Sequence, residues 1–294
     1  MEVTILTPTY NRAYKLIDLF KSLQEQTNKD FEWYIVDDGS TDDTKKTVDS
    51  FKEEASFPIK YVYKENGGKH TALNLGIKNI ESELTFIVDS DDSLTDEAID
   101  TIYQYHKKYA NNSELCGYTF LRCFPDGRIN GKEFVQNEKI SSYIESRING
   151  NDAYSDKAEV FRTNCLKEFP FPEYPGERFL GEDIVWIRMG RKYQMVNINK
   201  AIYVGDYLEG GLTDNRRNNN IKSPLGCMNR AKEFMDPQLR IKYRIKATLQ
   251  YIVYGKFAGK TLSQLVIDSQ YKGLVVLFAF PGFIIYQKWK RQYK

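Results

Sequence analysis

Short apolar segments alternate with longer amphipathic segments over the first 110 residues, and this alternation constrains the possible folds more than any other feature. Four apolar segments have the length and composition of buried strands: Val3–Thr7, Glu32–Asp37, Tyr61–Lys64 and Leu84–Asp89. Three segments between them begin at turn-forming residues and have a helical pattern: Ala13–Gln26, Asp42–Glu54 and Lys69–Asn79. Repeated strand–helix units predict an α/β fold, with a mostly parallel sheet flanked by helices on both faces.

Polar clusters follow three of the four predicted strands. They are Thr7-Pro8-Thr9-Tyr10-Asn11-Arg12, Asp37-Asp38-Gly39-Ser40 and Asp89-Ser90-Asp91-Asp92. Parallel strands bring their carboxyl ends to one edge of the sheet, and ligands of such folds bind at that edge. We therefore expect the three clusters to lie together at a binding site.

The acidic cluster Asp89-Ser90-Asp91-Asp92 comes directly after a buried apolar run. Carboxylates this close repel one another, and a hard divalent cation such as Mn²⁺ or Mg²⁺ would relieve the repulsion. Such ions commonly bring phosphate groups with them. An ordinary turn that caps the next helix explains the same residues about equally well, because Asp is a preferred N-cap residue. By itself, the cluster leaves both interpretations open.

The third predicted strand leads into a glycine turn and a helix start, Glu65-Asn66-Gly67-Gly68-Lys69-His70. Free backbone N–H groups, the positive end of the helix dipole and the Lys69 ammonium together suit a diphosphate. A simple connecting turn is the commoner use of paired glycines. The diphosphate interpretation is favoured here because the turn is predicted at the same sheet edge as the acidic cluster.

The sequence after residue 110 has a less regular pattern. A strand is predicted at Cys116–Phe124, and the acidic pair Glu182-Asp183 opens a helix, where acids are often only complements to the helix dipole. The segment Gly205–Thr213 has the glycines and polar residues of a loop that covers a site. The four cysteines form no CxxC pair and no zinc-like cluster with the two histidines, so we expect reduced thiols.

Charge is distributed unevenly along the chain. Residues 239–294 contain eleven Lys/Arg residues and one acid, a net charge of +10, which leaves −8 for residues 1–238 because the total is +2. Five apolar residues of this basic tail share one predicted helical face: Ile241, Ile245, Leu249, Ile252 and Val253. The apolar run Leu274–Ile285 falls short of the roughly 20 residues that cross a bilayer.

The basic tail therefore predicts helices that lie in the membrane interface and bind an anionic membrane surface. A helical lid packed on the α/β domain is the alternative, and it is less favoured because a lid needs no surplus of positive charge. Nucleic acid is not an expected partner, because the basic residues are interleaved with large aliphatic side chains. The N-terminus runs into a strand without a secretory signal, so we expect a cytoplasmic protein associated peripherally with the inner face of the cell membrane.

Taken in order, the motifs resemble those of family 2 glycosyltransferases of the GT-A (Rossmann-like) fold, of the type that builds bacterial cell-surface or capsular polysaccharides. Six motifs carry the resemblance over roughly residues 2–215: Pro8-Thr9-Tyr10-Asn11-Arg12, Gln26-Thr27, Val36 to Asp42, Asn66-Gly67-Gly68 with Ala72-Leu73-Asn74, the DxD motif Asp89-Ser90-Asp91, and Glu182-Asp183. Their order and spacing argue against a chance match. The resemblance implies a catalytic domain at 1–215, with a nucleotide-binding half at 1–110 and an acceptor half at 111–215, and a helical extension at 216–294.

The resemblance also implies a role for each matching residue. Four residues would hold the nucleotide base, with the tyrosine packed on it: Pro8, Thr9, Tyr10 and Asp38. Gly68 and Lys69 would face the diphosphate. Asp89 and Ser90 would lie near the ribose or the metal ion, and Asp91 would join Asp89 as a metal ligand. Asp183 would be the catalytic base.

The implied reaction is a single displacement at the anomeric carbon of a nucleotide sugar. A UDP-sugar is the expected donor, Mn²⁺ or Mg²⁺ the cofactor, and a hydroxyl of a lipid-linked glycan the acceptor. Asp183 would take the acceptor proton while the metal and Lys69 stabilise the departing diphosphate. A single base without a second carboxylate nucleophile implies inversion at the anomeric carbon.

Two departures from the family pattern qualify this expectation. No Gln-x-x-Arg-Trp motif of processive members follows the Glu182-Asp183 helix, so transfer of one sugar per encounter is implied. No histidine follows His106, so phosphate and water would complete the ligands of the metal. Two other functions stay open. A sugar-phosphate nucleotidyltransferase would normally need a glycine-rich basic loop near the first strand, and an inactive glycan-binding protein would not need the complete set of acids.

Overall fold

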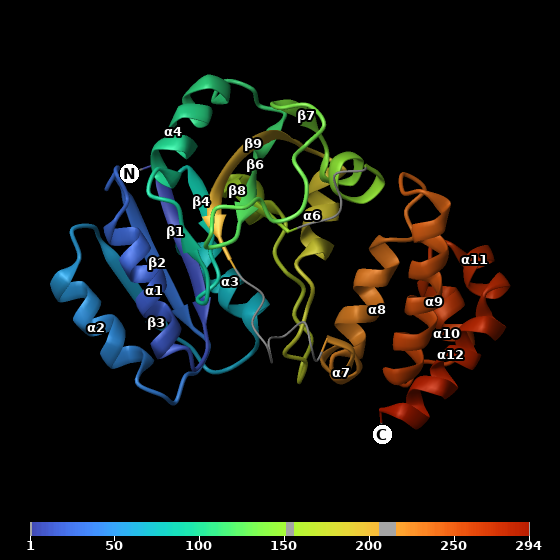
Figure 1. Cartoon of the computed structure of the whole chain (residues 1–294). Helices are drawn as coiled ribbons and strands as arrows, with labels where there is room; N and C mark the ends of the chain where they lie inside the picture. The colour runs from blue at the N-terminus through green and yellow to red at the C-terminus, as the bar shows by residue number, and fades with distance from the viewer. Residues whose placement is uncertain (1, 151–155, 206–215, 294) are drawn as a thin grey trace. The chain divides into compact units, whose positions relative to one another are not determined.

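The computed structural model of the chain describes residues 2–150, 156–205 and 216–293, which form two compact units (Figure 1). The first unit comprises Met1–Pro170 and Met189–Tyr207, and the second comprises Phe171–Arg188 and Leu208–Lys294. The Glu182-Asp183 pair therefore belongs to the unit that contains the C-terminal helices. The functional boundary expected at residue 215 stays a prediction.

The first unit is built on a mixed sheet whose described strands follow the order β3-β2-β1-β4-β8-β6-β9-β5, with β7 paired to β9. The strands are β1 Val3–Thr9, β2 Phe31–Asp37, β3 Ile59–Tyr63, β4 Leu84–Ile87, β5 Ser93–Leu94, β6 Leu115–Cys123, β7 Lys139–Ser141, β8 Lys157–Arg162 and β9 Gln194–Val204. The first four strands in the chain run parallel to one another, as predicted. Antiparallel pairs such as β4 with β8 and β6 with β8 make the rest of the sheet mixed. The predicted α/β fold is confirmed.

Helices cover both faces of the parallel part of this sheet. The helical segments of the first unit are α1 Ala13–Gln24, α2 Thr44–Glu54, α3 Lys69–Asn79, α4 Ala98–Tyr109, the π-helical segment η1 Ile144–Asn149 and α5 Thr163–Glu168. Side chains alternate along β1, so Ile5 joins a buried core with α1 and α2, whereas Leu6 faces α3. A Cβ on Gly76 of α3 would lie 2.4 Å from Leu6 Cδ1, so the glycine lets this helix approach the sheet closely.

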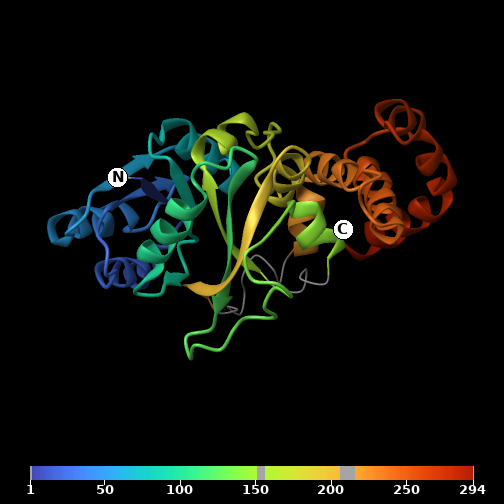
Figure 2. The same cartoon turned by 90° about the horizontal axis from the view of Figure 1, so that it is seen from above.

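The second unit is helical. Its helices are α6 Asp183–Gly190, whose last residues belong to the first unit, α7 Arg216–Lys222, α8 Pro224–Glu233, α9 Ile241–Phe257, α10 Leu262–Asp268, α11 Lys272–Leu277 and α12 Ala279–Gln292. The central helix is α9, which contacts α8, α10, α11 and α12, the orange to red ribbons of Figure 2. Its buried residues include Ala247, Tyr251 and Ile252, whereas Ile241 is 58% exposed. Only part of the apolar face predicted for α9 is therefore buried.

The C-terminal helix α12 packs closely on α9. A Cβ on Gly282 would lie 2.8 Å from Ile252 Cγ2, so only a glycine fits there without movement. Pro281 lies in the first turn of α12, where a helix needs no backbone donor, so the Pro281-Gly282 pair does not interrupt the helix. No helix in the described ranges is long and apolar enough to span a bilayer.

Candidate active site

The loops that follow β1 and β2 are tied together by backbone and side-chain hydrogen bonds. The Asp38 N–H donates to the Thr9 carbonyl at 2.8 Å. Asn11, which adopts a φ of 51°, donates its N–H to Ser40 Oγ at 2.8 Å and accepts the Thr41 N–H on Oδ1 at 2.8 Å. The first two polar clusters predicted from the sequence therefore do lie side by side at the carboxyl ends of their strands.

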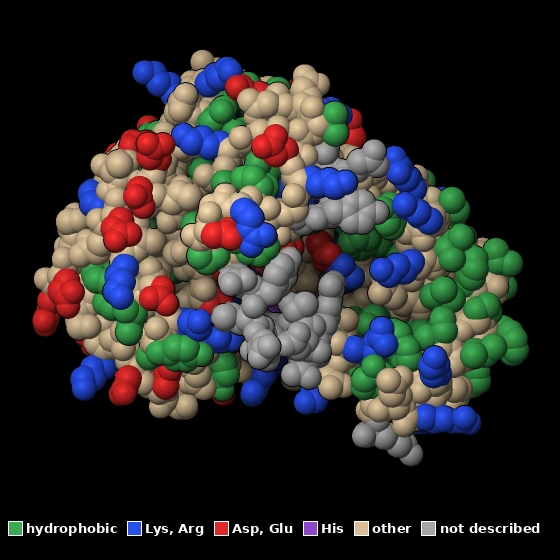
Figure 3. Space-filling model, viewed as in Figure 1, with side chains coloured by type: hydrophobic (Ala, Val, Ile, Leu, Met, Phe, Trp, Pro, Cys, Tyr) green, Lys and Arg blue, Asp and Glu red, His purple; other side chains and the backbone are tan. Residues whose placement is uncertain are grey.

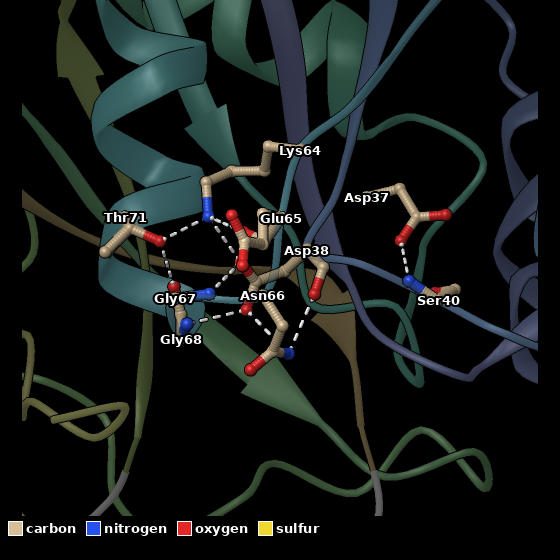
Figure 4. A network of polar contacts seen from close by, with 9 residues as sticks. All are labelled: Asp37, Asp38, Ser40, Lys64, Glu65, Asn66, Gly67, Gly68 and Thr71. Atoms are coloured by element: carbon tan, nitrogen blue, oxygen red, sulfur yellow. Dashed lines mark hydrogen bonds and ion pairs between the residues drawn. The ribbon is translucent and has the colours of Figure 1, made fainter. Parts of the chain in front are cut away.

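The carboxylate of Asp38 organises the glycine turn (Figure 4). It is buried and accepts hydrogen bonds from the backbone N–H groups of Gly67 at 2.9 Å and Gly68 at 2.7 Å. Lys64 Nζ lies 2.7 Å from the same carboxylate. A buried carboxylate needs donors, and the amides of the turn supply them. The N–H groups expected to be free for a diphosphate are thus already donated to Asp38. The contact between Lys64 and Asp38 was not predicted from the sequence.

The residues assigned to the nucleotide base stand at the end of β1. Pro8 and Thr9 pair with Val36 and Asp37 of β2, and the ring of Tyr10 just beyond them is 47% exposed. Thr9 Oγ1 is buried and has no hydrogen-bond partner within the described parts of the chain. A buried polar atom without a partner costs about 1–3 kcal/mol, so a bound ligand or water is expected to satisfy it.

Each acid of the DxD segment faces a different cation. Asp89 Oδ1 lies 2.5 Å from Lys69 Nζ, Asp91 Oδ2 lies 3.7 Å from Arg12 Nη1, and Asp92 Oδ2 lies 2.5 Å from Arg122 Nη2. The side chains of Asp89 and Asp91 are 37% and 30% exposed, whereas that of Asp92 is 11% exposed. Ser90, which lies between Asp89 and Asp91 in the sequence, is buried. These ion pairs bring Arg12, Lys69 and the acidic cluster to one sheet edge, as the strand pattern predicted.

The surroundings of Asp89 and Asp92 shift the pKa values of these two acids in opposite directions. Burial opposes the ionisation of Asp89, but the charge and hydrogen bond of Lys69, together with the charge of Arg122, hold the pKa of Asp89 below its usual range. Burial raises the pKa of Asp92 to about 6, although the Arg122 guanidinium works against that increase. Asp89 is therefore kept as a charged oxygen donor, whereas Asp92 belongs to the interior of the protein.

The donor chemistry fits a divalent cation. Asp89 and Asp91 offer carboxylate oxygens, the ligands that Mg²⁺ and Mn²⁺ prefer. Within the described ranges, no three His, Cys, Asp or Glu side chains form a cluster that could hold a metal ion.

In the second unit, Asp183 is the first residue of α6 and forms a bidentate ion pair with Arg230 of α8. Arg230 Nε lies 2.5 Å from Asp183 Oδ1, and Arg230 Nη2 contacts Asp183 Oδ2. A Cβ on Gly181 would lie 3.0 Å from both Arg230 Nε and Asp183 Oδ1, so the glycine leaves room for this pair. Arg230 holds the Asp183 carboxylate in one orientation, and no sequence motif indicated it. The cover loop predicted at 205–213 lies outside the described residues apart from Gly205.

The sheet order, the flanking helices and the acidic strand ends define an α/β protein of the GT-A type. A family model described as glycosyl transferase family 2 matches residues 4–153, and the chain belongs to this family. The Staphylococcus aureus TarS 1-349 structure in complex with UDP-GlcNAc has the same fold, with a TM-score of 0.66 at 19% identity over 99% of this chain and 92% of that one.

Two relatives extend the similarity beyond the family model. An uncharacterized glycosyltransferase of Rickettsia conorii is 39% identical over 211 residues, which are 68% of this chain and 32% of the relative. This chain thus spans about a third of the length of that protein. The GalNAc(5)-diNAcBac-PP-undecaprenol beta-1,3-glucosyltransferase of Campylobacter jejuni is 26% identical over 213 residues, 69% of this chain and 64% of the relative.

Proposed function

We propose that this chain is a metal-dependent, inverting glycosyltransferase that transfers one hexosyl unit from a UDP-sugar to a hydroxyl of a lipid-linked glycan in cell-surface polysaccharide synthesis. This function rests mainly on two ion pairs at the carboxyl ends of the parallel strands. Lys69 pairs with Asp89, and Arg12 pairs with Asp91. Both signs of charge needed by a metal–diphosphate group are present there. Structural roles alone do not require two partly exposed acids and two cations at one ligand-binding edge.

The nucleotide would bind at the end of β1. The exposed ring of Tyr10 offers a face for stacking on a base, and the buried Thr9 hydroxyl is a hydrogen-bonding group that a ligand can satisfy. Asp38 contributes by holding the glycine turn through Gly67 and Gly68. The TarS structure named above contains UDP-GlcNAc, which supports a uridine nucleotide as the donor carrier here.

The reaction needs a base, a stabilised leaving group and an acceptor. Asp183 would accept the proton of the acceptor hydroxyl, with its carboxylate held by Arg230. The Lys69 ammonium would stabilise the charge that develops on the departing diphosphate. A bound Mn²⁺ or Mg²⁺ would add Lewis-acid stabilisation of the same charge and would be held by Asp89 and Asp91. The name of the Campylobacter relative includes a lipid-linked glycan, which supports an acceptor of that class.

A panel of nucleotide sugars tests this function. We expect at least one UDP-sugar to be hydrolysed slowly in the presence of Mn²⁺, because water can replace the acceptor, and we expect chelation by EDTA to stop the reaction. Release of UDP is the measurement. Pyrophosphate release from a sugar phosphate and a nucleoside triphosphate would instead favour the nucleotidyltransferase. UDP binding that ignores Mn²⁺, without turnover of any donor, would favour the inactive glycan-binding protein.

The second unit carries an exposed hydrophobic surface that supports association with a membrane. We name it the α11–α12 apolar patch, and its exposed members are Val276, Leu277, Phe280, Phe283 and Ile284. Figure 3 shows hydrophobic side chains gathered over these helices with lysines and arginines among them. Residues 239–294 have a net charge of +10, which matches an anionic lipid surface. We propose that this patch seats the protein peripherally on the inner face of the cell membrane.

We expect the double substitution Leu277→Glu and Phe280→Glu to lower binding to phosphatidylserine-containing vesicles at least about tenfold. Each of these side chains contributes about 1.5–3 kcal/mol when it leaves water, and the new carboxylates are repelled by the lipid. Co-sedimentation of the full chain with vesicles measures the effect. Substitutions are preferable to truncation near Asp236, because the buried Met235 belongs to the core that α8 shares with α9.

The matched control is Val135→Glu, which changes an 88% exposed apolar residue of the first unit. It should bind vesicles as the unmodified chain does. Equal binding of the double variant and the unmodified chain would contradict a role for the patch. Equal binding to phosphatidylcholine vesicles would contradict the contribution of the basic residues.

A further inference from the structure

A largely buried side-chain cluster adjoins the DxD segment, and neither the DxD motif nor the proposed reaction uses it. It consists of Asp92, Arg122 of β6 and Tyr203 of β9, all in the first unit. The Tyr203 hydroxyl accepts the Asp89 N–H at 3.1 Å and donates to Asp92 Oδ2 at 2.6 Å. One hydroxyl therefore bonds to both ends of the turn that carries the proposed metal ligands.

Arg122 completes this cluster from a second strand. Its Nη2 lies 2.5 Å from Asp92 Oδ2, and its guanidinium carbon lies 3.8 Å from the centre of the Tyr203 ring. The cation thus contacts both the carboxylate and the aromatic face, a geometry that favours a single arrangement of all three side chains. A Cβ on Gly205 would lie 2.7 Å from Asp92 Oδ1, so the glycine leaves the carboxylate just enough room.

The backbone that follows Asp92 is held by β9, the strand that contains Tyr203. Ser93 and Leu94 of β5 pair with Val204 and Tyr203 of β9. Asp92 is the most buried of the three acids, whereas Asp89 and Asp91 remain partly exposed on the same short turn. A purely structural ion pair would explain the contact between Asp92 and Arg122, but it does not require the hydrogen bond between Tyr203 and the backbone of Asp89.

We propose that Asp92, Arg122 and Tyr203 are positioning residues that hold Asp89 and Asp91 in the arrangement required to bind a divalent cation. This role rests on the proposed metal-dependent function and adds residues of β6 and β9 to it. Groups that orient metal ligands typically change metal affinity about 10- to 100-fold when they are removed. The β9 strand would thereby be part of the metal site although it contributes no ligand.

The substitution Tyr203→Phe removes the hydroxyl and keeps the ring under Arg122. We expect the affinity of the UDP-saturated chain for Mn²⁺ to fall about 10- to 100-fold, measured by calorimetric titration. UDP binding without metal should change less than about twofold, because the base is held at the end of β1. Tyr118→Phe is the matched control. It removes a buried hydroxyl of the same sheet that lies 2.9 Å from His106 Nδ1, and it should leave Mn²⁺ affinity unchanged.

Unchanged Mn²⁺ affinity of Tyr203→Phe, or an equal loss in Tyr118→Phe, would overturn the positioning role. If Tyr203→Phe does not fold, Gly205→Ala takes its place, because the added methyl group displaces Asp92 and should weaken Mn²⁺ binding in the same way. Unchanged affinity of that variant would also overturn the role. If the unmodified chain with bound UDP does not bind Mn²⁺, the metal-dependent function itself is wrong. A loss of the positioning role alone would leave Mn²⁺ binding by the unmodified chain intact.

Discussion

Replacing Asp91 with asparagine is expected to reduce metal-dependent hydrolysis and transfer by at least about 10²- to 10³-fold, because the metal then loses a charged ligand. Among the described residues, the ion pair of Asp91 is the longest of the three in the cluster, since Arg12 Nη1 lies 3.7 Å from Asp91 Oδ2. The Asp91 carboxylate therefore needs little rearrangement to bind a metal ion. Asparagine keeps the shape of the side chain, removes its charge and replaces one carboxylate oxygen with an NH2 group.

The measurement is UDP release from the best donor of the panel at saturating Mn²⁺, together with UDP affinity in the absence of metal. That affinity should change little, because the nucleotide base does not contact Asp91 in the proposed site. Asp96→Asn is the control, since Asp96 is an exposed acid a few residues further along the chain. Full activity of the Asp91 variant would refute the proposed metal seat.

Replacing Asp183 with asparagine is expected to lower transfer to the acceptor about 10²- to 10⁴-fold, the usual contribution of a general base. The carboxylate is held by two contacts with Arg230, so its orientation does not depend on the substrate alone. Asparagine can retain one contact with the guanidinium through its carbonyl oxygen, but it cannot accept the proton. The loss should therefore be in the chemical step.

Nucleotide affinity separates this loss from a folding defect. The Asp183→Asn variant should bind UDP and Mn²⁺ as the unmodified chain does while failing to transfer sugar. Glu173→Gln, a change at an exposed acid of the same unit, should leave both properties intact. Transfer at the normal rate by the Asp183 variant would remove this residue from the proposed mechanism.

Local sequence patterns were sufficient for the strands and helices between residues 3 and 89, but they did not predict β5 and α4. The helix predicted at Lys69–Asn79 has the same bounds in the structure, and the strands β1 to β4 lie within a few residues of their predicted positions. Strands that are buried on both faces of a parallel sheet are apolar throughout, so they can be recognised directly in the sequence. The predicted face of α9 was less accurate, because Tyr251 and Tyr254 are buried there while Ile241 is exposed. A helix in a bundle can bury its tyrosines when their hydroxyls find partners, as Tyr251 does on the Leu265 carbonyl at 3.0 Å.

The sequence alone determined the family, the parallel strand ends and the identity of the acids in the DxD segment, because each motif and each strand can be recognised from residues that are consecutive in the chain. Only the tertiary structure decided how those acids are partnered. Asp38 uses the Gly67 and Gly68 amides, Asp92 meets Arg122 and Tyr203, and Asp183 meets Arg230. These partners lie about thirty to more than one hundred residues away in sequence. A buried carboxylate takes whichever donors the fold brings to it, and no local pattern encodes that choice.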